Sequence, residues 1–596
     1  MKLKRLAAAM MVAAMTISLT ACGGSSGGGG GSASSDSDSQ TGSKDANEVT
    51  EVAAESGDPV YGGSVTVFDD DISVDPCFEP AAQTSPWRLC YEALWAVDWT
   101  LDRNEYSDMF RSGYVTMNEA TGQIADSWEF DSDSAVLTVK LRDDVYFQNL
   151  EPYNGRKLVA DDVKWSYDRT VGLDGAEVAT GDIRTDWATS MKMLSKVEVI
   201  DDNTVAFTLT SGDEITLNNF IVNSMSLMIA GPEWDDLTED QKTDYHYLVG
   251  TGPYIIDSYE ADNYIKWVRN DDYYDTDDSH PENKLPYLDS VTIMNFESTS
   301  NQVSQFIAGS LDFLYRTESN ISASELEMIT SSDVDYSVYS YSTSPIGIAL
   351  KQVDANEPLK DVRVREALQY AIDGQEIWND YHHNEGDIQI CGVFNALTAL
   401  SAVDEWDEEA YLAYTTQDLD KAKELLEEAG YPDGFEFNVA IFPNLDENLF
   451  SLAADYLAEI GVTMNINIYN TPVEMEAAGY DESISDCLFC TLGSMDLDMT
   501  SQFIGKDGMR NSFFYSDDTE EGYLQAALNA TTVDELETNA RALDKYVAEN
   551  YLQLMLGGSA QESWYANNRV HGYSGENFDI KKNFEEQTLA HVWVED

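Results

Sequence analysis

The chain has 596 residues, of which 109 are acidic and 34 are basic, so its formal net charge is −75. A field this negative repels nucleic acid and anionic lipid surfaces, which argues against a groove for phosphate backbones. The length exceeds what one hydrophobic core usually supports, and we therefore expect two or more lobes.

The start of the chain has the organisation of a secretory signal. A cationic start is followed by uncharged, apolar or small residues over 6–20, and the tetrapeptide Leu-Thr-Ala-Cys then ends at Cys22. This order is typical of a signal peptide, and the tetrapeptide resembles the lipobox of bacterial lipoproteins. The resemblance implies that residues 1–21 are removed and that Cys22 carries lipid; the alternative is a plain signal followed by an ordinary buried cysteine. Residues 22–58 are rich in glycine, serine and aspartate, which predicts a flexible linker.

Five further cysteines are an odd and sparse set for a disulfide framework. Two of them form a Cys-x-x-Cys motif over 487–490, within an apolar run typical of a strand, and no second cysteine pair or suitable histidine lies nearby in the sequence. We interpret these two as buried thiols rather than as a redox or zinc site. The disulfide state is left open for the whole set, which comprises Cys77, Cys90, Cys391, Cys487 and Cys490.

The first elements of the folded part are predicted to be strands. Residues 62–67 predict a short strand after a turn. Residues 124–141 predict a hairpin, because a turn cluster separates two apolar runs. Acidic residues then mark the first turn of a predicted helix over 159–169. A second hairpin is predicted over 196–209, around an Asp-Asp-Asn turn.

The block that ends with this helix resembles the signature of the family 5 extracellular solute-binding proteins, the receptors of oligopeptide, dipeptide and nickel ABC importers. The resemblance lies in the motif SWE at 127–129, in KLR at 140–142 and in the helix start. The chain departs from the pattern at 148–149, where Gln-Asn replaces the usual His-Asp-Gly turn. Further matching stretches follow in the family's order: Gly250–Tyr254, Val268–Tyr274, Leu285–Asp289, Ile307–Phe313 and Asp361–Asp373.

The C-terminal half predicts an α/β lobe from its residues alone. Apolar residues share one helical face over 419–429 and again over 449–460, and each stretch is followed by glycine. Apolar and polar residues alternate over 435–441 and 462–468, as in strands. The order strand, helix, strand predicts a βαβ unit, in which the two strands are parallel.

The resemblance implies an α/β fold of mixed helices and strands. It is expected to be a bilobed fold like that of class II periplasmic binding proteins, with an extra third domain. Ligand is expected to bind at the hinge between domains I and III. The expected boundaries are 59–92, 195–340 and 560–596 for the discontinuous domain I, 93–194 for domain II and 341–559 for domain III.

No set of residues in the sequence matches a catalytic site. His-Glu-x-x-His is absent, and Gly505-Lys506 is followed by Asp507, which is incompatible with a phosphate-binding P-loop. The six histidines show no metal-ligand spacing, and we interpret the adjacent pair at 382–383 as solvated or packed rather than as part of a nickel site. The sequence therefore predicts a protein that is not an enzyme and uses no cofactor or metal.

The stretch 492–503 follows an apolar strand and resembles the segment with which the family binds the α-ammonium group of its ligand. An ungapped match places Asp496 on the ammonium-binding aspartate, with Ser494 and Leu497 as further ligand-binding candidates. A carboxylate at a strand end can hold a desolvated ammonium through a charge-assisted hydrogen bond; the alternative is that Asp496 caps a turn or helix. Gly493 and Leu497 replace the family's Trp and Tyr, and its prolines are absent, which weakens the case for a peptide.

The resemblance implies a lipid-anchored receptor on the extracytoplasmic face of a bacterial cell membrane. It is expected to be a monomer that captures a small solute, preferably a short peptide, and delivers it to an ABC permease and ATPase complex. Its lipid is the only expected membrane contact, and no nucleic acid is expected to bind. With 12 tryptophans and 33 tyrosines, an oligosaccharide receptor is the alternative, because aromatic rings pack on sugars as well as in cores. A surface hydrolase is disfavoured by the absent motifs, and an adhesive protein by the lack of repeats.

Overall fold

The structure is a computed structural model of the full chain. Single residues and short segments within it are left undescribed, as are the first 57 residues. The described residues are 58–68, 89–103, 105–112, 114–173, 191–261, 263–296, 298–316, 323–341, 345–382, 388–442, 445–479, 481, 483–491, 497–506, 518–557, 562–575 and 585–595.

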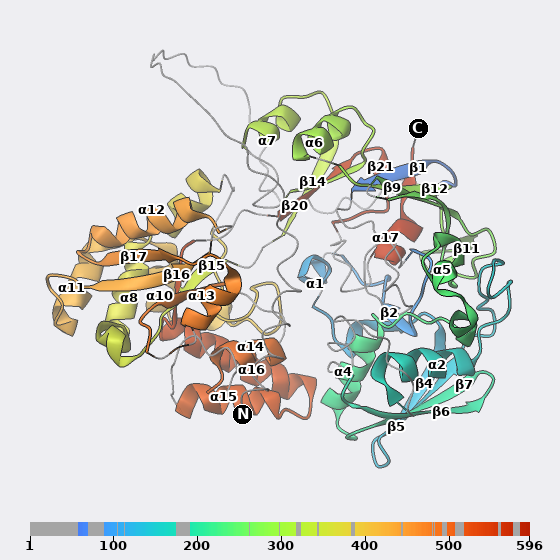
Figure 1. Ribbon diagram of the computed structural model, residues 1–596, viewed down its shortest axis with the longest axis horizontal. Coiled ribbons are helices and arrows are strands. Elements are labelled where there is room, and N and C mark those ends of the chain that lie inside the picture. The colour runs from blue at the N-terminus through green and yellow to red at the C-terminus, as the bar shows by residue number, and fades with distance from the viewer. Residues whose placement is uncertain are drawn as a thin grey trace.

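Figure 1 shows two lobes, which we name lobe A and lobe B. Lobe A holds the described residues before 342 and after 561, and lobe B holds those of 345–557. The chain passes between the lobes twice, after β14 (Tyr336–Tyr341) and before β20 (Glu562–Asn567). These two strands pair antiparallel, with Tyr341 opposite Glu562. Both passages therefore leave lobe A from the same end of one strand pair.

The first core of lobe A is built on a mixed four-stranded sheet, in which β1 is parallel to β12 and the other pairs are antiparallel. Trp234 and Trp267 are fully buried against it. The end of the chain returns to this core, because Leu589 and Val592 belong to the same cluster. The strand predicted over 62–67 is confirmed as β1. In spatial order the strands are β1 (Ser64–Phe68), β12 (Ser290–Met294), β9 (Tyr264–Arg269) and β8 (Tyr254–Glu260).

A second core of lobe A lies between an antiparallel sheet and the helices α2 and α4. Both predicted hairpins are present in this sheet, and the predicted helix start is that of α2. The expected domain boundary at 194/195 falls at the start of β6, within this sheet; the division into three domains stays a prediction. The elements are β4 (Ala125–Asp131), β5 (Val136–Leu141), β7 (Thr204–Leu209), β6 (Leu194–Asp201), α2 (Ala160–Val171) and α4 (Glu214–Ser224).

Lobe B is organised around a five-stranded sheet of mixed direction. The predicted βαβ unit is confirmed, because β16 and β17 are parallel and α12 lies between them in the chain. Gly430 ends the preceding helix α11 (Leu419–Ala429) at a φ of 93°, which favours glycine. In spatial order the strands are β17 (Thr463–Ile468), β16 (Glu436–Ile441), β18 (Cys487–Thr491), β15 (Ile346–Ala349) and β19 (Gln553–Met555).

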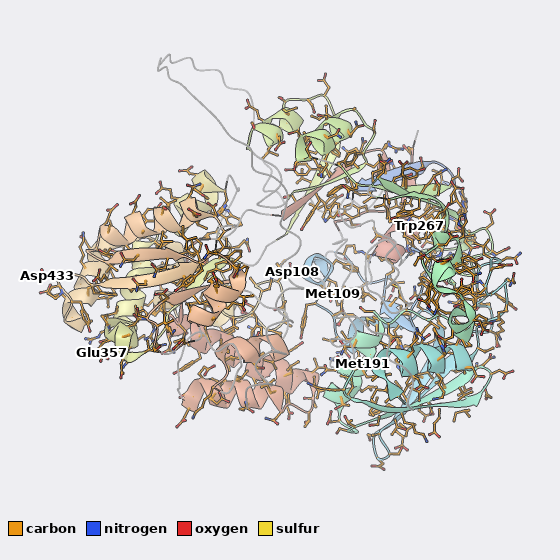
Figure 2. All side chains as sticks on the ribbon, viewed as in Figure 1. Asp108, Met109, Met191, Trp267, Glu357 and Asp433 are labelled. Atoms are coloured by element: carbon orange, nitrogen blue, oxygen red, sulfur yellow. The ribbon has the colours of Figure 1, made fainter. Side chains whose placement is uncertain are left out.

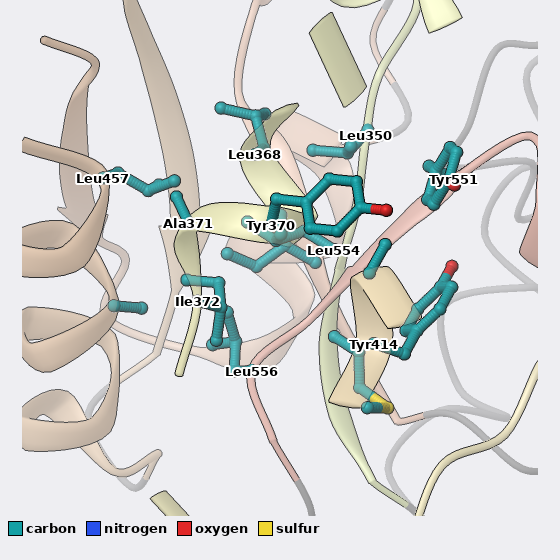
Figure 3. Close-up of a cluster of buried hydrophobic side chains, with 14 of the residues drawn as sticks. Leu350, Leu368, Tyr370, Ala371, Ile372, Tyr414, Leu457, Tyr551, Leu554 and Leu556 are labelled. Carbon is teal, nitrogen blue, oxygen red and sulfur yellow. The ribbon is translucent and has the colours of Figure 1, made fainter. Parts of the chain in front are cut away.

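The main core of lobe B gathers apolar side chains from segments that are far apart in the sequence. Figure 3 shows Leu368 of α8, Leu350, which follows β15, and Leu554 of β19 in this one cluster. The rings of Tyr414 and Tyr551 stack with centroids 5.9 Å apart. Burying one leucine side chain contributes about 1.5–3 kcal/mol relative to leaving it exposed, so this cluster fixes the sheet on which the candidate site is built.

The other elements are shorter or lie outside the three large sheets. In lobe A, a further antiparallel sheet sets β20 between β13 and β14, and it carries the two chain passages. The remaining strands of lobe A are β2 (Trp95–Val97), β3 (Ala120–Gly122), β10 (Thr276–Asp277), β11 (His280–Lys284), β13 (Phe313–Arg316), β21 (Val570–His571) and β22 (Trp593–Val594). Its remaining helices are α1 (Ser107–Ser112), η3 (Met117–Glu119), η5 (Pro232–Asp236), α5 (Glu239–Lys242), η6 (Tyr245–Tyr247), α6 (Thr299–Ile307), α7 (Ala323–Thr330) and α17 (Glu585–His591). Lobe B also holds η7 (Asp354–Lys360), α8 (Val362–Ala371), α9 (Gly374–Glu376), η8 (Ile377–Tyr381), η9 (Val403–Glu405), α10 (Glu408–Thr415), α12 (Glu447–Ala458), α13 (Pro472–Gly479), α14 (Leu497–Ile504), α15 (Asp518–Leu528) and α16 (Val533–Glu549).

Candidate functional site

The strand that precedes the predicted ligand segment lies in the middle of the lobe B sheet. β18 is parallel to β16 on one side and antiparallel to β15 on the other. The carboxyl ends of β17, β16 and β18 therefore lie at the same edge of the sheet, which is where open α/β sheets bind ligands. Phe442 and Tyr469, which directly follow β16 and β17, are half-buried at this edge. The strand expected before the candidate aspartate is thus in a position suited to binding.

The predicted ligand residues follow this strand in the sequence, which is described as far as Thr491. Asp496 and Ser494 lie outside the described residues, as does Cys22. Leu497 is the first residue of α14 and is half-buried against apolar side chains of lobe B. Asp496 immediately precedes a helix, so the capping alternative and the ligand role both stay open. The assignment of these residues to a ligand site stays a prediction.

On the side of lobe A, an arginine is held between aromatic rings close to α1. The guanidinium carbon of Arg103 lies 4.1 Å from the ring centroid of Trp99 and 3.9 Å from that of Phe110. Trp99 in turn stacks on His591, with centroids 4.8 Å apart. In the view of Figure 2, Asp108 of α1 appears between the two lobes. The stack fixes a cation among ring faces, an arrangement worth about 0.5–2 kcal/mol.

Sequence reasoning missed this stack. Trp99 and Arg103 are four residues apart, a spacing too common to be a signal, and His591 comes from the far end of the chain. The high aromatic content was the only hint. All three side chains are half-buried, so the stack combines a rigid aromatic surface with a fixed positive charge.

A buried carboxyl group lies where the two cores of lobe A meet. Glu92 is 1% exposed, and its Oε1 accepts hydrogen bonds from the hydroxyls of Tyr273 and Tyr274 at 2.8 and 2.9 Å. Burial raises the pKa of Glu92 to about 7, against the opposing effect of these hydroxyls. The carboxyl group is therefore partly protonated near neutral pH.

The motif Gly-Thr-Gly-Pro-Tyr, one of the stretches that resemble the family, packs closely against the backbone at this junction. A Cβ on Gly250 would lie 2.0 Å from the carbonyl oxygen of Cys90, and one on Gly252 would lie 2.8 Å from the carbonyl carbon of Cys90. The backbone segments therefore approach too closely for any side chain at the two glycines. The motif has a packing role, at a distance in the sequence from the predicted ligand segment.

We expect the stability of lobe A to fall as the pH rises from about 4.5 to about 7, because folded Glu92 holds its proton more tightly than the unfolded chain does. The Glu92→Gln side chain stays neutral at every pH, so the free energy of unfolding of this variant should change less with pH over this range. The variant should gain on the order of 3 kcal/mol over wild type at pH 8, since one pKa unit corresponds to about 1.4 kcal/mol. Urea denaturation between pH 4 and pH 8 measures both profiles. Glu260→Gln, at an exposed carboxylate, is the control; parallel profiles for Glu92→Gln and wild type would contradict the prediction.

The cysteines of the described residues are free thiols in the structure. Cys90, Cys391 and Cys487 are buried, and Cys490 is half-buried. Burial raises the pKa values of Cys487 and Cys490 to about 12, so neither forms a reactive thiolate near neutral pH. This agrees with the interpretation of the Cys-x-x-Cys motif as packed thiols. Cys77 lies outside the described residues.

Two features are absent from the described residues. Among them, no group of three or more histidine, cysteine, aspartate or glutamate side chains is arranged to hold a metal ion. Their helices include none that is both long and apolar enough to cross a membrane. Of the adjacent histidines, His382 is 5% exposed, and His383 is outside the described part.

Two lobes that are joined by two adjacent chain passages, with parallel strands ending at one edge of a sheet, define a bilobed α/β binding protein. A family model described as "Bacterial extracellular solute-binding proteins, family 5 Middle" matches residues 119–489, which is more than half of the chain. The chain therefore belongs to the family 5 bacterial extracellular solute-binding proteins. The expected family and bilobed α/β fold are thereby confirmed. Members of this family are substrate-binding receptors.

Individual relatives are distant and differ in the ligands that their names give. The chain is 27% identical to heme-binding protein A of Haemophilus influenzae over 387 residues, which cover 62% of this chain and 64% of that protein. It is 23% identical to di/tripeptide-binding protein 1 of Pseudomonas aeruginosa over 325 residues, which cover 54% of this chain and 57% of that protein. The chain thus matches less than two thirds of the length of both relatives.

A solved structure shows the same fold. The ABC transporter-associated periplasmic binding protein DppA from Helicobacter pylori, in complex with the peptide STSA, superposes with a TM-score of 0.61. The alignment covers 90% of this chain and 99% of that one, at 20% sequence identity. At this identity the likeness establishes the architecture, and the ligand of this chain has to be argued separately.

Proposed function

We propose that this chain is a lipid-anchored extracytoplasmic receptor that captures short peptides between its two lobes and delivers them to an ABC permease. The family match over residues 119–489 carries the receptor part of the proposal. Support for a peptide comes from the relative named as a di/tripeptide-binding protein and from the solved structure with a bound tetrapeptide. The candidate Asp496 supplies a partner for a peptide's ammonium group. We further propose that Ser494 and Leu497 lie in the same site.

The test is direct binding followed by recovery of the ligand. Calorimetry of the purified protein with di- to pentapeptides should show saturable binding, and mass spectrometry should recover the peptide unchanged. Small-angle scattering should show a smaller radius of gyration once peptide is bound, because closure brings the lobes together. Cleavage of the peptide would overturn the receptor assignment. Tight binding of a neutral oligosaccharide with no peptide binding would favour the sugar receptor instead.

Anchoring at Cys22 gives a separate expected outcome. Cys22→Ala should move the protein from the membrane fraction to the soluble fraction, because one acyl chain binds a membrane marginally whereas two or more hold it firmly. Fractionation with immunodetection measures the distribution. Ser25→Ala, three residues later in the linker, is the control and should leave the protein with the membrane. Unchanged membrane association of Cys22→Ala would refute the anchor.

A further inference from the structure

The two lobes contact each other at a second place, on the opposite side of the molecule from the chain passages (Figure 1). There the N-terminus of α4 in lobe A meets that of α16 in lobe B. The backbone N–H of Ile215 donates to the carbonyl oxygen of Thr531 at 3.2 Å, and the N–H of Val533 donates to Glu214 Oε1 at 3.5 Å. The first amides of a helix have no partner within that helix. Each helix here therefore finds a hydrogen-bond partner on the other lobe.

Both helix ends are otherwise capped by their own lobe, which keeps them in place for this contact. Asp213 caps α4 by accepting a hydrogen bond from the backbone N–H of Thr216 at 2.8 Å. Thr532 caps α16 by accepting one from the N–H of Glu535 at 3.2 Å. These caps do not use the backbone N–H groups of Ile215 and Val533, which instead donate hydrogen bonds to the other lobe.

Tyr114 adds an apolar contact between the lobes. It belongs to lobe A, between α1 and η3, yet its ring packs against a cluster of lobe B side chains. Burial raises the pKa of its hydroxyl, and the nearby charges of Glu537 and Glu119 raise it further. Leu497, beside the candidate aspartate, packs against the same cluster, which thus connects the contact between the lobes with the candidate ligand site. The members from α14, α15 and α16 are Ile504, Leu524, Ala540, Leu543 and Val547.

Two carboxylates oppose this attraction. Burial and then the charges of Asp534 and Glu119 raise the pKa of Glu537, while Arg541 lowers it. Glu119 is held in place by a capping box, in which its Oε2 accepts hydrogen bonds from the backbone N–H and the hydroxyl of Thr116 at 2.8 and 2.7 Å. Moving Glu119 away from lobe B would break both bonds. Glu119 therefore stays close to Glu537 as long as its capping box is intact, and their repulsion persists while the lobes are in contact.

We propose that the contact of α4 and Tyr114 with α16 is a latch between the lobes, which sets how long a bound solute is retained. The inference rests on the proposed receptor function for its link to ligand, but the latch itself acts in the ligand-free protein. The backbone hydrogen bonds and the ring of Tyr114 favour the closed arrangement, and the paired carboxylates limit its stability so that the lobes can reopen. The residues of the latch tune retention without touching ligand, so they shift the dissociation rates of different ligands by the same factor.

The apolar part is tested without ligand. In the full chain carrying Cys22→Ala, so that no lipid adds to the scattering, Tyr114→Ala should increase the radius of gyration of the ligand-free protein. The loss of this half-buried aromatic anchor should also speed the release of bound peptide about tenfold or more. Tyr411→Ala, which removes a 45% exposed ring of α10 in lobe B, is the control and should change neither quantity. An unchanged radius of gyration in folded Tyr114→Ala would overturn the latch.

The charged part is tested by neutralising two half-buried carboxylates with side chains of the same shape. Glu537→Gln and Glu119→Gln should each slow peptide release about two- to fivefold at low salt, with a smaller effect at 1 M salt. Glutamine preserves the capping box at Glu119. The double variant should gain no more than one single variant, because removing either charge already removes the repulsion. Glu424→Gln, at an exposed carboxylate of α11, is the control.

The two proposals fail in different ways. Fully additive effects of Glu537→Gln and Glu119→Gln, or slower release for one peptide only, would overturn the latch and leave the receptor assignment standing. If the wild-type protein binds no peptide at all, the receptor assignment fails, and the radius of gyration of ligand-free Tyr114→Ala still decides the latch.

Discussion

Replacing Asp496 with asparagine is expected to weaken the binding of a short peptide by about thirty- to several-thousand-fold. The proposed role of Asp496 is to pair with the ammonium group of the peptide when the lobes close. Removing one partner of a buried charge pair costs roughly 2–5 kcal/mol, because the other charge stays buried without compensation, and about 1.4 kcal/mol corresponds to one decade of affinity. Asparagine keeps the shape of the side chain, so the variant tests the charge alone. Calorimetry with a free peptide measures the change.

Two controls separate this role from a general disturbance of the segment. Asp498→Asn changes a second aspartate two residues later, and it should alter affinity much less. A peptide with an acetylated N-terminus has no ammonium group, so it should bind wild type poorly and be almost unaffected by Asp496→Asn. Equal affinity of wild type and Asp496→Asn for the free peptide would return Asp496 to the alternative role of a helix cap.

The second large effect concerns stability and a different aspartate. Asp544→Ala should lower the free energy of unfolding of lobe B by about 2–6 kcal/mol, because two buried backbone N–H groups lose their acceptor at about 1–3 kcal/mol each. Asp544 is fully buried on α16, and its two carboxylate oxygens accept hydrogen bonds from the N–H groups of Phe394 and Ala402, both at 2.9 Å. The single side chain thus holds the loop 388–402 against the helix. Burial raises its pKa to about 6, against the opposing effect of these bonds.

Urea denaturation at pH 7, followed by tryptophan fluorescence, measures this effect, since Trp378 and Trp406 both lie in the core of lobe B. Asp544→Asn keeps one acceptor oxygen and should cost less than the alanine variant. Asp455→Ala, at an exposed position of α12, should change stability by no more than about 0.5 kcal/mol. A loss below 1 kcal/mol for Asp544→Ala would show that the loop is held by other contacts.

Local patterns in the sequence predicted the elements well, because their causes are local. The apolar stripe of α11 and the glycine that ends it lie within twelve consecutive residues, 419–430, and the alternation in β16 and β17 reflects burial on one side of each strand. The parallel pairing followed from the order of these elements. The family resemblance supplied the rest of the architecture, including the two lobes, which no local pattern contains.

Features that depend on contacts between distant segments could not be predicted. The arginine stack brings together Arg103 and His591, which lie far apart in the chain. Asp544 holds its loop through backbone N–H groups, and such contacts do not depend on the residue types of the loop. The expected boundary at 194/195 lies within a sheet for a related reason. The hairpin β6–β7 completes the second core because β7 pairs with β5, and the paired residues, from Val136 with Thr208 to Lys140 with Thr204, are about seventy residues apart in the chain. The assignment of Asp496 as a ligand-binding residue rests on an ungapped sequence match alone.

The position of the two chain passages determines how the lobes can move. The two chain passages start side by side on the paired strands β14 and β20, so they form a single hinge. The lobes can rotate easily about this hinge and have little freedom to slide or twist. The contact between α4 and α16 lies far from this hinge, where a small rotation produces the largest displacement (Figure 1). A hydrogen bond tolerates a stretch of only a few tenths of an ångström. This contact is therefore either made or lost over a narrow range of angles, and we expect two main arrangements of the lobes, with partly open forms sparsely populated.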